Sequence, residues 1–144
     1  MPGVSASASA PADILVIGAG LAGLAAARAP AARGRRPVVL DKGRGVGGRL
    51  ATRRIGGATL DHGAQFFTAR DPAFRAISDA WQAAGVSLPW ADHFPAAGAA
   101  EDGRRETRFR GAAGMTSPAK ALAAGLAVRT SAKVTAIRWR ADGW

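Results

Sequence analysis

The chain has 144 residues, 48% of them apolar, and carries 20 lysines and arginines against 10 aspartates and glutamates, a formal net charge of +10. It contains no cysteine and two histidines, which excludes disulfides, thiolate metal sites and thiol catalysis within this chain. No run of about 18 apolar residues occurs, so the sequence predicts no membrane span. Residues 1–12 are small and lack a basic start, so we expect a disordered leader, no signal peptide and a cytoplasmic protein.

The first predicted element is a strand at 13–17, a β-branched run typical of a buried parallel strand. It leads directly into GAGLAG at 18–23, and an alanine-rich segment with high helix propensity follows to about residue 33. Gly34 suits the position just past this helix, whereas Pro30 is expected to kink or shorten its last turn. A second buried strand is predicted at 37–41. Strand, glycine turn, helix and strand together predict one right-handed βαβ unit.

Residues 42–57 are rich in glycine and arginine, and we expect them to form an irregular loop. Asp71 and Pro72 then open a predicted helix as its N-cap and first residue, and Gly85 ends it. Helical spacing places three apolar side chains on one face of this helix: Phe74, Ile77 and Trp81.

Residues 86–115 show no strong periodicity and are expected to form short strands and loops. The Ser-Pro pair at 117–118 repeats the cap-and-proline pattern and predicts a short helix to about residue 124. Two more strands are predicted, at 127–129 and 134–139. The Asp-Gly pair at 142–143 is a hairpin-turn signal, so we expect the last strand to lack its partner and the chain to be truncated.

The glycine loop at 18–23 has the pattern of a dinucleotide-binding turn. Gly18 allows the tight turn off the strand, Gly20 lets the backbone approach a pyrophosphate, and Gly23 allows close packing of helix on sheet. The helix N-terminus then offers unpaired N–H groups to the phosphates. Asp41 ends the second strand, where an acid accepts hydrogen bonds from the adenosine ribose.

A second glycine loop, RGVGGRLAT at 44–52, follows Asp41 directly. Adjacent glycines bring the main chain close to a ligand, and Arg49 can donate charge-assisted hydrogen bonds to a pyrophosphate. Both loops leave the same end of neighbouring parallel strands, so we expect them to lie side by side.

GAGLAG, the acid at 41 and RGVGGRLAT together resemble the amine-oxidase-like FAD oxidoreductases. Within that superfamily, LDKGRGVGGRLATRR and DHGAQFFTARDPAF are similar to the renalase-like branch. GAAGMTSPAKALAAGL is similar to the family segment that leads into the third Rossmann strand. The resemblance covers residues 12–144 and is most specific in the first 65 residues.

The resemblance implies non-covalent FAD, hydride transfer from a reduced substrate to the flavin, and reoxidation by oxygen. It implies a small-molecule substrate, either a reduced nicotinamide dinucleotide or an amine, and assigns neither a catalytic side chain nor a metal. The segment at 61–66 is one that the family places near the flavin ring, where Gln65 is a better candidate than His62, because hydride transfer needs no histidine base. The residues implied to bind the cofactor are Gly18, Ala19, Gly20, Ala22, Gly23, Asp41, Lys42, Arg44, Gly47, Gly48, Arg49 and Gln65.

The predicted fold class is α/β: the N-terminal part of a Rossmann-type FAD-binding domain with an inserted portion of a substrate domain. Residues 13–65 form the βαβ unit and the second loop, 66–115 the inserted portion, and 116–144 return with the third strand and the start of a β-meander. The fourth-strand side of the sheet is left open, so we expect marginal stability.

Three alternatives stay open. The first is a non-catalytic nucleotide-binding fragment. The second is an NAD-binding protein, since the glycine loop and Asp41 suit NAD equally well, although the second loop argues against it. The third is a basic nucleic-acid-binding protein, which the scattered arginines support poorly. Four aromatic residues are interpreted as core more readily than as pocket lining: Phe66, Phe67, Trp81 and Trp90.

Overall fold

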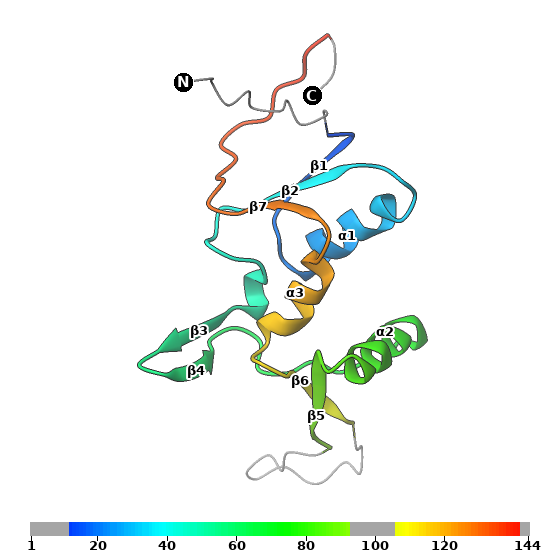
Figure 1. Cartoon of the computed structure of the whole chain (residues 1–144), viewed down its shortest axis with the longest axis vertical. Helices are drawn as coiled ribbons and strands as arrows, with labels where there is room; N and C mark the ends of the chain where they lie inside the picture. The colour runs from blue at the N-terminus through cyan, green and yellow to red at the C-terminus, as the bar shows by residue number, and fades with distance from the viewer. Residues whose placement is uncertain (1–11, 93–105, 142–144) are drawn as a thin grey trace, which may run out of the picture.

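A three-stranded parallel sheet and the two helices that pack on it form one half of the molecule, the upper half in Figure 1. The structure is a computed structural model and describes residues 12–92 and 106–141. Strand β1 (Ile14–Ile17) is followed by helix α1 (Leu21–Ala31) and strand β2 (Pro37–Leu40). Much later in the chain, helix α3 (Thr116–Ala123) leads into strand β7 (Ala127–Arg129). The strand order is β1-β2-β7, all parallel. The predicted βαβ unit and third strand are therefore confirmed, and the fold is a Rossmann-type α/β arrangement.

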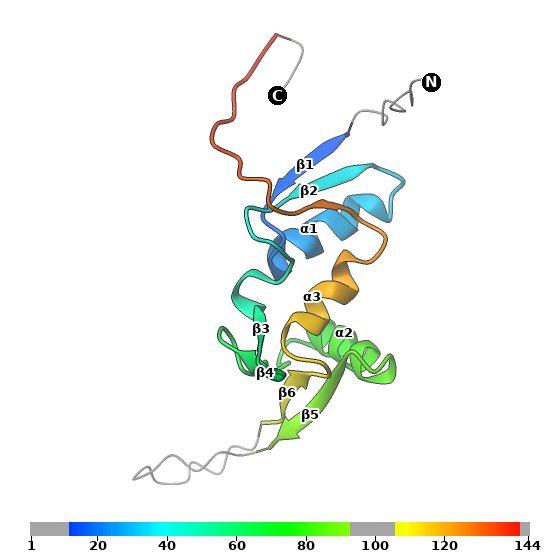
Figure 2. The same cartoon turned by 60° about the vertical axis from the view of Figure 1, so that its left-hand side comes forward.

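The core lies between this sheet and the two helices, which lie on the same side of it in both views (Figures 1 and 2). Alternate residues of the strands face the helices, as the two-residue period of a strand requires. The fully buried members of this core are Ala19, Leu24, Ala27, Val39 and Ala119. Helix α1 is also tied to the end of α3, because the Arg28 guanidinium donates hydrogen bonds of 2.7–3.0 Å to three carbonyl oxygens there. This contact satisfies carbonyl groups that a helix C-terminus leaves unpaired.

The opposite face of β1 is exposed. Leu15 and Ile17 retain 56% and 52% of their accessible surface, and β1 is an edge strand of the sheet. Among the described residues, no helix covers this face (Figure 2). The expected open side of the sheet is thus observed, and the marginal stability that we expect from it stays a prediction.

Helix α1 contains Pro30 and ends one residue after it. Its last residue is Ala31, about two residues earlier than the alanine-rich run predicts. Pro30 has no N–H to donate, but its carbonyl oxygen accepts from Arg33 and Arg35. Gly34 adopts a positive φ of 75° and turns the chain towards β2, as expected.

The prediction of an irregular loop at 42–57 is wrong from residue 52 onward. After a short 3₁₀ turn, η1 (Gly48–Leu50), the chain forms an antiparallel hairpin of β3 (Thr52–Ile55) and β4 (Ala58–Asp61). The turn is Gly56-Gly57, with φ of 55° and 84°. Two consecutive positive φ angles are what a type I′ hairpin turn demands, so the Gly-Gly pair was a usable sequence signal.

A second apolar cluster lies under the hairpin formed by β5 (Ser87–Ala91) and β6 (Arg108–Gly111), next to α2 (Pro72–Ala83). Asp71 caps α2 as predicted, accepting from the N–H groups of Ala73 and Phe74. The cluster consists of rings with centroids 5.5–6.0 Å apart: Phe67, Phe74, Trp81 and Phe109. Phe67 and Trp81 therefore pack in an aromatic core, although Trp81 also borders a cavity described below. The core interpretation is wrong for Phe66 and Trp90, which are 38% and 44% exposed.

Two predictions near the end of the chain are wrong. Helix α3 starts two residues earlier than expected, with Met115 at the N-cap, and the Ser117 hydroxyl instead accepts from the N–H of Ala113. Residues 134–139 form no strand in the part of the chain that the structure describes. A strand requires a neighbour for its N–H and C=O groups, so propensity alone does not produce one. Residues 1–11 of the leader predicted at 1–12, the second histidine, His93, and the turn at 142–143 lie outside the described residues.

Candidate dinucleotide-binding site

The glycine loop between β1 and α1 has the geometry its three glycines predict. Gly18 adopts a φ of 104°, which a residue with a side chain rarely takes. A Cβ on Gly23 would overlap the carbonyl oxygen of Gly18, so only glycine lets α1 pack this closely on β1. A Cβ on Gly20 would meet no protein atom within 4 Å. Gly20 therefore faces open space, where a ligand can approach the backbone.

The N-terminus of α1 is free to bind an anion. Gly20 is its N-cap and provides no side chain to accept from the first N–H groups, and the first turn contains no acidic residue. Those N–H groups have no partner inside the helix, and the helix dipole adds a partial positive charge. A phosphate placed here would accept hydrogen bonds from main-chain groups alone.

Asp41 joins the two glycine loops. One carboxylate oxygen accepts a hydrogen bond of 2.6 Å from the N–H of Ala19, and the other accepts one of 2.6 Å from Gly43. The structure thus gives Asp41 a structural task in addition to the predicted contact with a ribose. A carboxylate has about four lone-pair positions, so two remain for further donors.

The second loop lies beside the first, as expected. The N–H of Gly47 donates to the carbonyl oxygen of Ala19 at 2.8 Å, and Gly20 and Gly47 form a parallel bridge. A Cβ on Gly48 would lie 3.3 Å from the Cα of Gly20. Gly48 is therefore favoured because two backbones meet at this point, and Gly47 because its φ of 121° is one that a residue with a side chain rarely adopts.

A cavity of about 750 Å³ opens between the two loops and α2. We call it the loop cavity. Its wall is mostly apolar and includes one charged side chain, that of Arg49 in the second glycine loop. The residues that line it are Gly20, Leu21, Ala22, Ala25, Gly47, Arg49, Leu50, Gly63, Ala64, Phe74, Ile77, Trp81 and Leu122.

Four predicted cofactor residues line the loop cavity: Gly20, Ala22, Gly47 and Arg49. The other members of the glycine loop form the turn behind them. Lys42 and Arg44 are exposed and line neither this cavity nor the second one described below. The structure therefore brings residues of both predicted glycine loops to one cavity, together with Arg49 but not Arg44.

A hydrogen-bond network connects the second loop and its hairpin to α3. Asp61 on β4 accepts from the Thr52 hydroxyl at 2.5 Å and from the N–H of Met115 at 2.9 Å. The hydroxyl of Thr116 donates to the Leu50 carbonyl oxygen and accepts from the N–H of Thr52. This network holds the start of the segment at 61–65.

That segment borders two cavities. Gly63 and Ala64 line the loop cavity, while Asp61 and Gln65 line a separate cavity of about 540 Å³, which we call the arginine cavity. Its full lining is Arg54, Thr59, Asp61, Gln65, Trp90, Arg110, Gly111, Ala112, Ala113 and Gly114. His62 is exposed and lines neither cavity. Gln65, expected with the cofactor residues, thus lies at the arginine cavity and not at the loop cavity, and its contact with a ligand stays a prediction.

Sequence reasoning missed Arg54, Arg110 and the network of Asp61. The Gly-Gly turn could have located β3 and β4, and hence the face on which Arg54 lies. No local signal predicts that Arg110 reaches the same cavity, because β6 is brought there by pairing with β5.

A glycine loop, an uncapped helix and a second glycine loop at the carboxyl ends of parallel strands are the features of a Rossmann-type dinucleotide-binding fold. The family of NAD(P)-binding Rossmann-like domains matches residues 16–81. The putative flavin-containing monoamine oxidase AofH of Mycobacterium tuberculosis is 39% identical over 66 residues, which are 46% of this chain and 14% of that protein. Putrescine oxidase of Kocuria rosea is 40% identical over 67 residues, with the same shares of each chain. A solved structure of wild-type putrescine oxidase bound to putrescine aligns with a TM-score of 0.45 and 28% identity over 59% of this chain and 23% of that one.

These sequence matches support a relationship with the flavin-containing amine oxidase superfamily over just under half of the chain. The chain spans 14% of the length of these two relatives. They do not distinguish the renalase-like branch from the rest of the superfamily. Within residues 12–92 and 106–141, no helix is long and apolar enough to cross a membrane.

Proposed function

We propose that this chain provides the dinucleotide-binding part of an FAD-dependent oxidoreductase of the renalase-like branch, with FAD held non-covalently. The observation that carries the proposal is the open space at Gly20, next to an uncapped helix N-terminus and a second glycine loop. The cytoplasmic location expected from the sequence is part of this proposal.

Each part of the site has a task that its chemistry allows. The N–H groups at the start of α1 bind the pyrophosphate of the cofactor, and Arg49 in the same cavity contributes a positive charge. Asp41 accepts from the adenosine ribose with the lone pairs that its two backbone contacts leave free. The paired glycines at 47 and 48 keep side chains out of the space between the loops.

FAD, when bound, accepts a hydride from a reduced small-molecule substrate and passes the electrons to oxygen. The chain's own residues bind and orient the cofactor and enclose the substrate. The substrate is a reduced nicotinamide dinucleotide or an amine. No side chain of the described residues is assigned a catalytic role, in keeping with a reaction whose chemistry belongs to the flavin.

The test is retention of FAD by the purified chain, measured as flavin absorbance that survives desalting. The wild type is expected to retain FAD, and Gly20→Ala to lose it, because the added methyl group fills the space meant for the pyrophosphate without touching the protein. Gly45→Ala is the matched control, since its Cβ would also meet no atom and it lies outside both cavities. Equal retention by Gly20→Ala and the wild type would contradict the proposed site.

The alternatives give different results. A chain that retains NAD(P)H but no flavin would be an NAD-binding Rossmann protein. A folded chain that binds nucleotide only weakly, and retains none after desalting, would be the non-catalytic nucleotide-binding fragment, which the exposed face of β1 favours. Steeply salt-dependent retention on DNA without bound nucleotide would support the basic nucleic-acid-binding alternative.

A further inference from the structure

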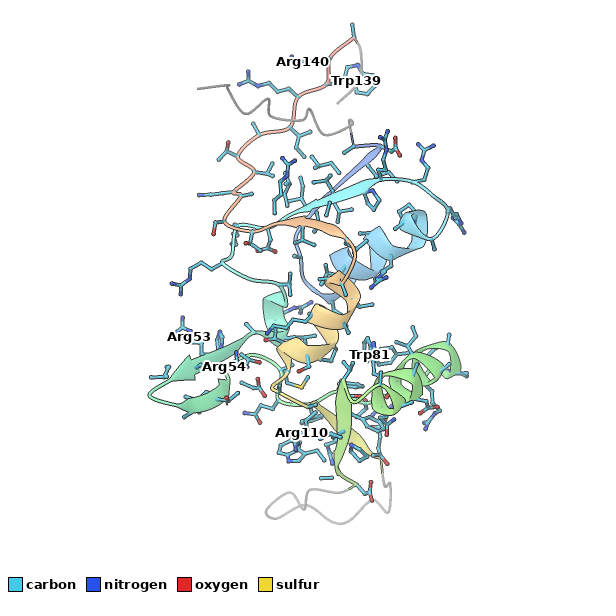
Figure 3. All side chains as sticks on the ribbon, in the orientation of Figure 1. Arg53, Arg54, Trp81, Arg110, Trp139 and Arg140 are labelled. Carbon is cyan, nitrogen blue, oxygen red and sulfur yellow. The ribbon has the colours of Figure 1, made fainter. Side chains whose placement is uncertain are left out.

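The arginine cavity has a charge that an amine-binding site would not have. Two arginines reach it from different elements, Arg54 from β3 and Arg110 from β6. Figure 3 labels both in the half of the molecule away from the parallel sheet. Among the described residues, neither arginine lies within ion-pair distance of a carboxylate. Arg110 makes one long contact of 3.5 Å, to the Gly111 carbonyl oxygen.

The one carboxylate in the wall does not neutralise them. Asp61 accepts from the Thr52 hydroxyl and the Met115 N–H with one oxygen, at the positive end of the α3 helix. Its charge is therefore already stabilised by donors outside the cavity. With two arginines against one aspartate, the lining carries a net charge of +1.

The cavity also has a planar apolar wall. Trp90 lines it and is 44% exposed, and its ring lies 6.1 Å from that of Phe66. Gln65 adds an amide that can both donate and accept. Guanidinium groups beside an apolar wall suit a planar ring that carries a negative charge, because a guanidinium can pair with the anion and can also stack on a planar ring.

We propose that the arginine cavity is the substrate subsite and that it takes a planar anion, an aromatic carboxylate or a nucleoside phosphate, and not a cationic amine. As a substrate subsite the cavity rests on the proposed function, because it adjoins the loop cavity through the segment at 61–65. As an anion-binding cavity it stands without bound FAD. A dication such as putrescine would be repelled by both guanidinium groups.

The experiment measures binding of AMP, benzoate and putrescine to the full chain by calorimetry, at two salt concentrations. We expect saturable binding of AMP or benzoate that weakens with salt, and no binding of putrescine. Binding of AMP alone would assign a nucleoside phosphate, and binding of benzoate alone a carboxylate. The double variant Arg54→Gln with Arg110→Gln is expected to weaken anion binding about tenfold, which corresponds to ~1.4 kcal/mol.

Arg53→Gln is the matched control, because Arg53 is exposed on the same strand but does not line the cavity. It is expected to bind the anion as the wild type does. The subsite is overturned if no anion binds, if putrescine binds more tightly, or if Arg53→Gln weakens binding as much as the double variant. Circular dichroism of each variant confirms that it is folded.

FAD retention, measured in parallel, separates the two proposals. Anion binding without FAD retention would leave the cavity as an anion site and refute its role in a flavoenzyme. FAD retention without anion binding would refute the subsite and leave the proposed function standing.

Discussion

The carboxylate of Asp61 accepts a hydrogen bond of 2.9 Å from the backbone N–H of Met115, 54 residues further along the chain. Asp61 ends the hairpin that follows the second glycine loop, and Met115 is the N-cap residue of α3. This contact connects the hairpin that follows the second glycine loop to the N-terminus of α3, where a negative charge is favourable.

Replacing Asp61 by alanine is expected to lower the free energy of unfolding by about 1–3 kcal/mol, since the buried N–H of Met115 and the Thr52 hydroxyl lose their acceptor. Urea unfolding followed by circular dichroism measures the change. Asp61→Asn keeps an acceptor oxygen, so its free energy of unfolding should fall less than that of Asp61→Ala. Asp79→Ala, an exposed aspartate on α2, should change little, and an effect as large as that of Asp61→Ala would contradict this explanation.

Gly23→Ala is expected to destabilise the chain by about 1–3 kcal/mol, because the new methyl group would overlap the carbonyl oxygen of Gly18 and push α1 away from β1. The midpoint of urea unfolding should fall, and FAD retention should fall with it. The control is again Gly45→Ala, whose added methyl group meets open space. A wild-type midpoint for Gly23→Ala would mean that close packing of α1 on β1 is not required.

The ion pair between Arg70 and Glu106 predicts a pH dependence. Both guanidinium–carboxylate contacts are 2.6 Å, and they join the segment before α2 to the chain entering β6. The hydrogen bond from Arg70 is the main cause of a lowered pKa at Glu106, opposed by its partial desolvation. A glutamate with a lowered folded pKa contributes stability above its ordinary value of about 4.3, and this contribution disappears as the pH falls through the folded pKa.

Arg70→Met should therefore be less stable than the wild type at neutral pH, with the difference shrinking as the pH falls below about 4.3. Urea unfolding at several pH values across that range measures the free energy of unfolding of the variant and of the wild type. Arg75→Met, on the exposed face of α2, should differ from the wild type by an amount that does not depend on pH. A pH-independent loss in Arg70→Met would assign the effect to lost packing instead of the ion pair.

Local rules predicted the elements whose signals lie close together in the sequence. Glycine spacing, β-branched runs and the Asp71 cap correctly located β1, α1, β2 and α2. The prediction of a strand at 134–139 is wrong because a strand also needs a neighbouring strand, which no local sequence pattern supplies. The hairpin at 52–61 was missed although its Gly-Gly turn carried a recognised signal.

The sequence by itself determined the βαβ unit and the adjacency of the two glycine loops, because both follow from backbone conformations that only glycine permits and from the order of parallel strands. Only the tertiary structure decided that the segment at 61–65 lies between two cavities, that Asp61 holds the start of α3, and that Arg54 and Arg110 share one cavity. Those relationships join residues about 50 positions apart through strand pairing and a half-buried carboxylate, and such long-range contacts depend on the packing of the whole chain.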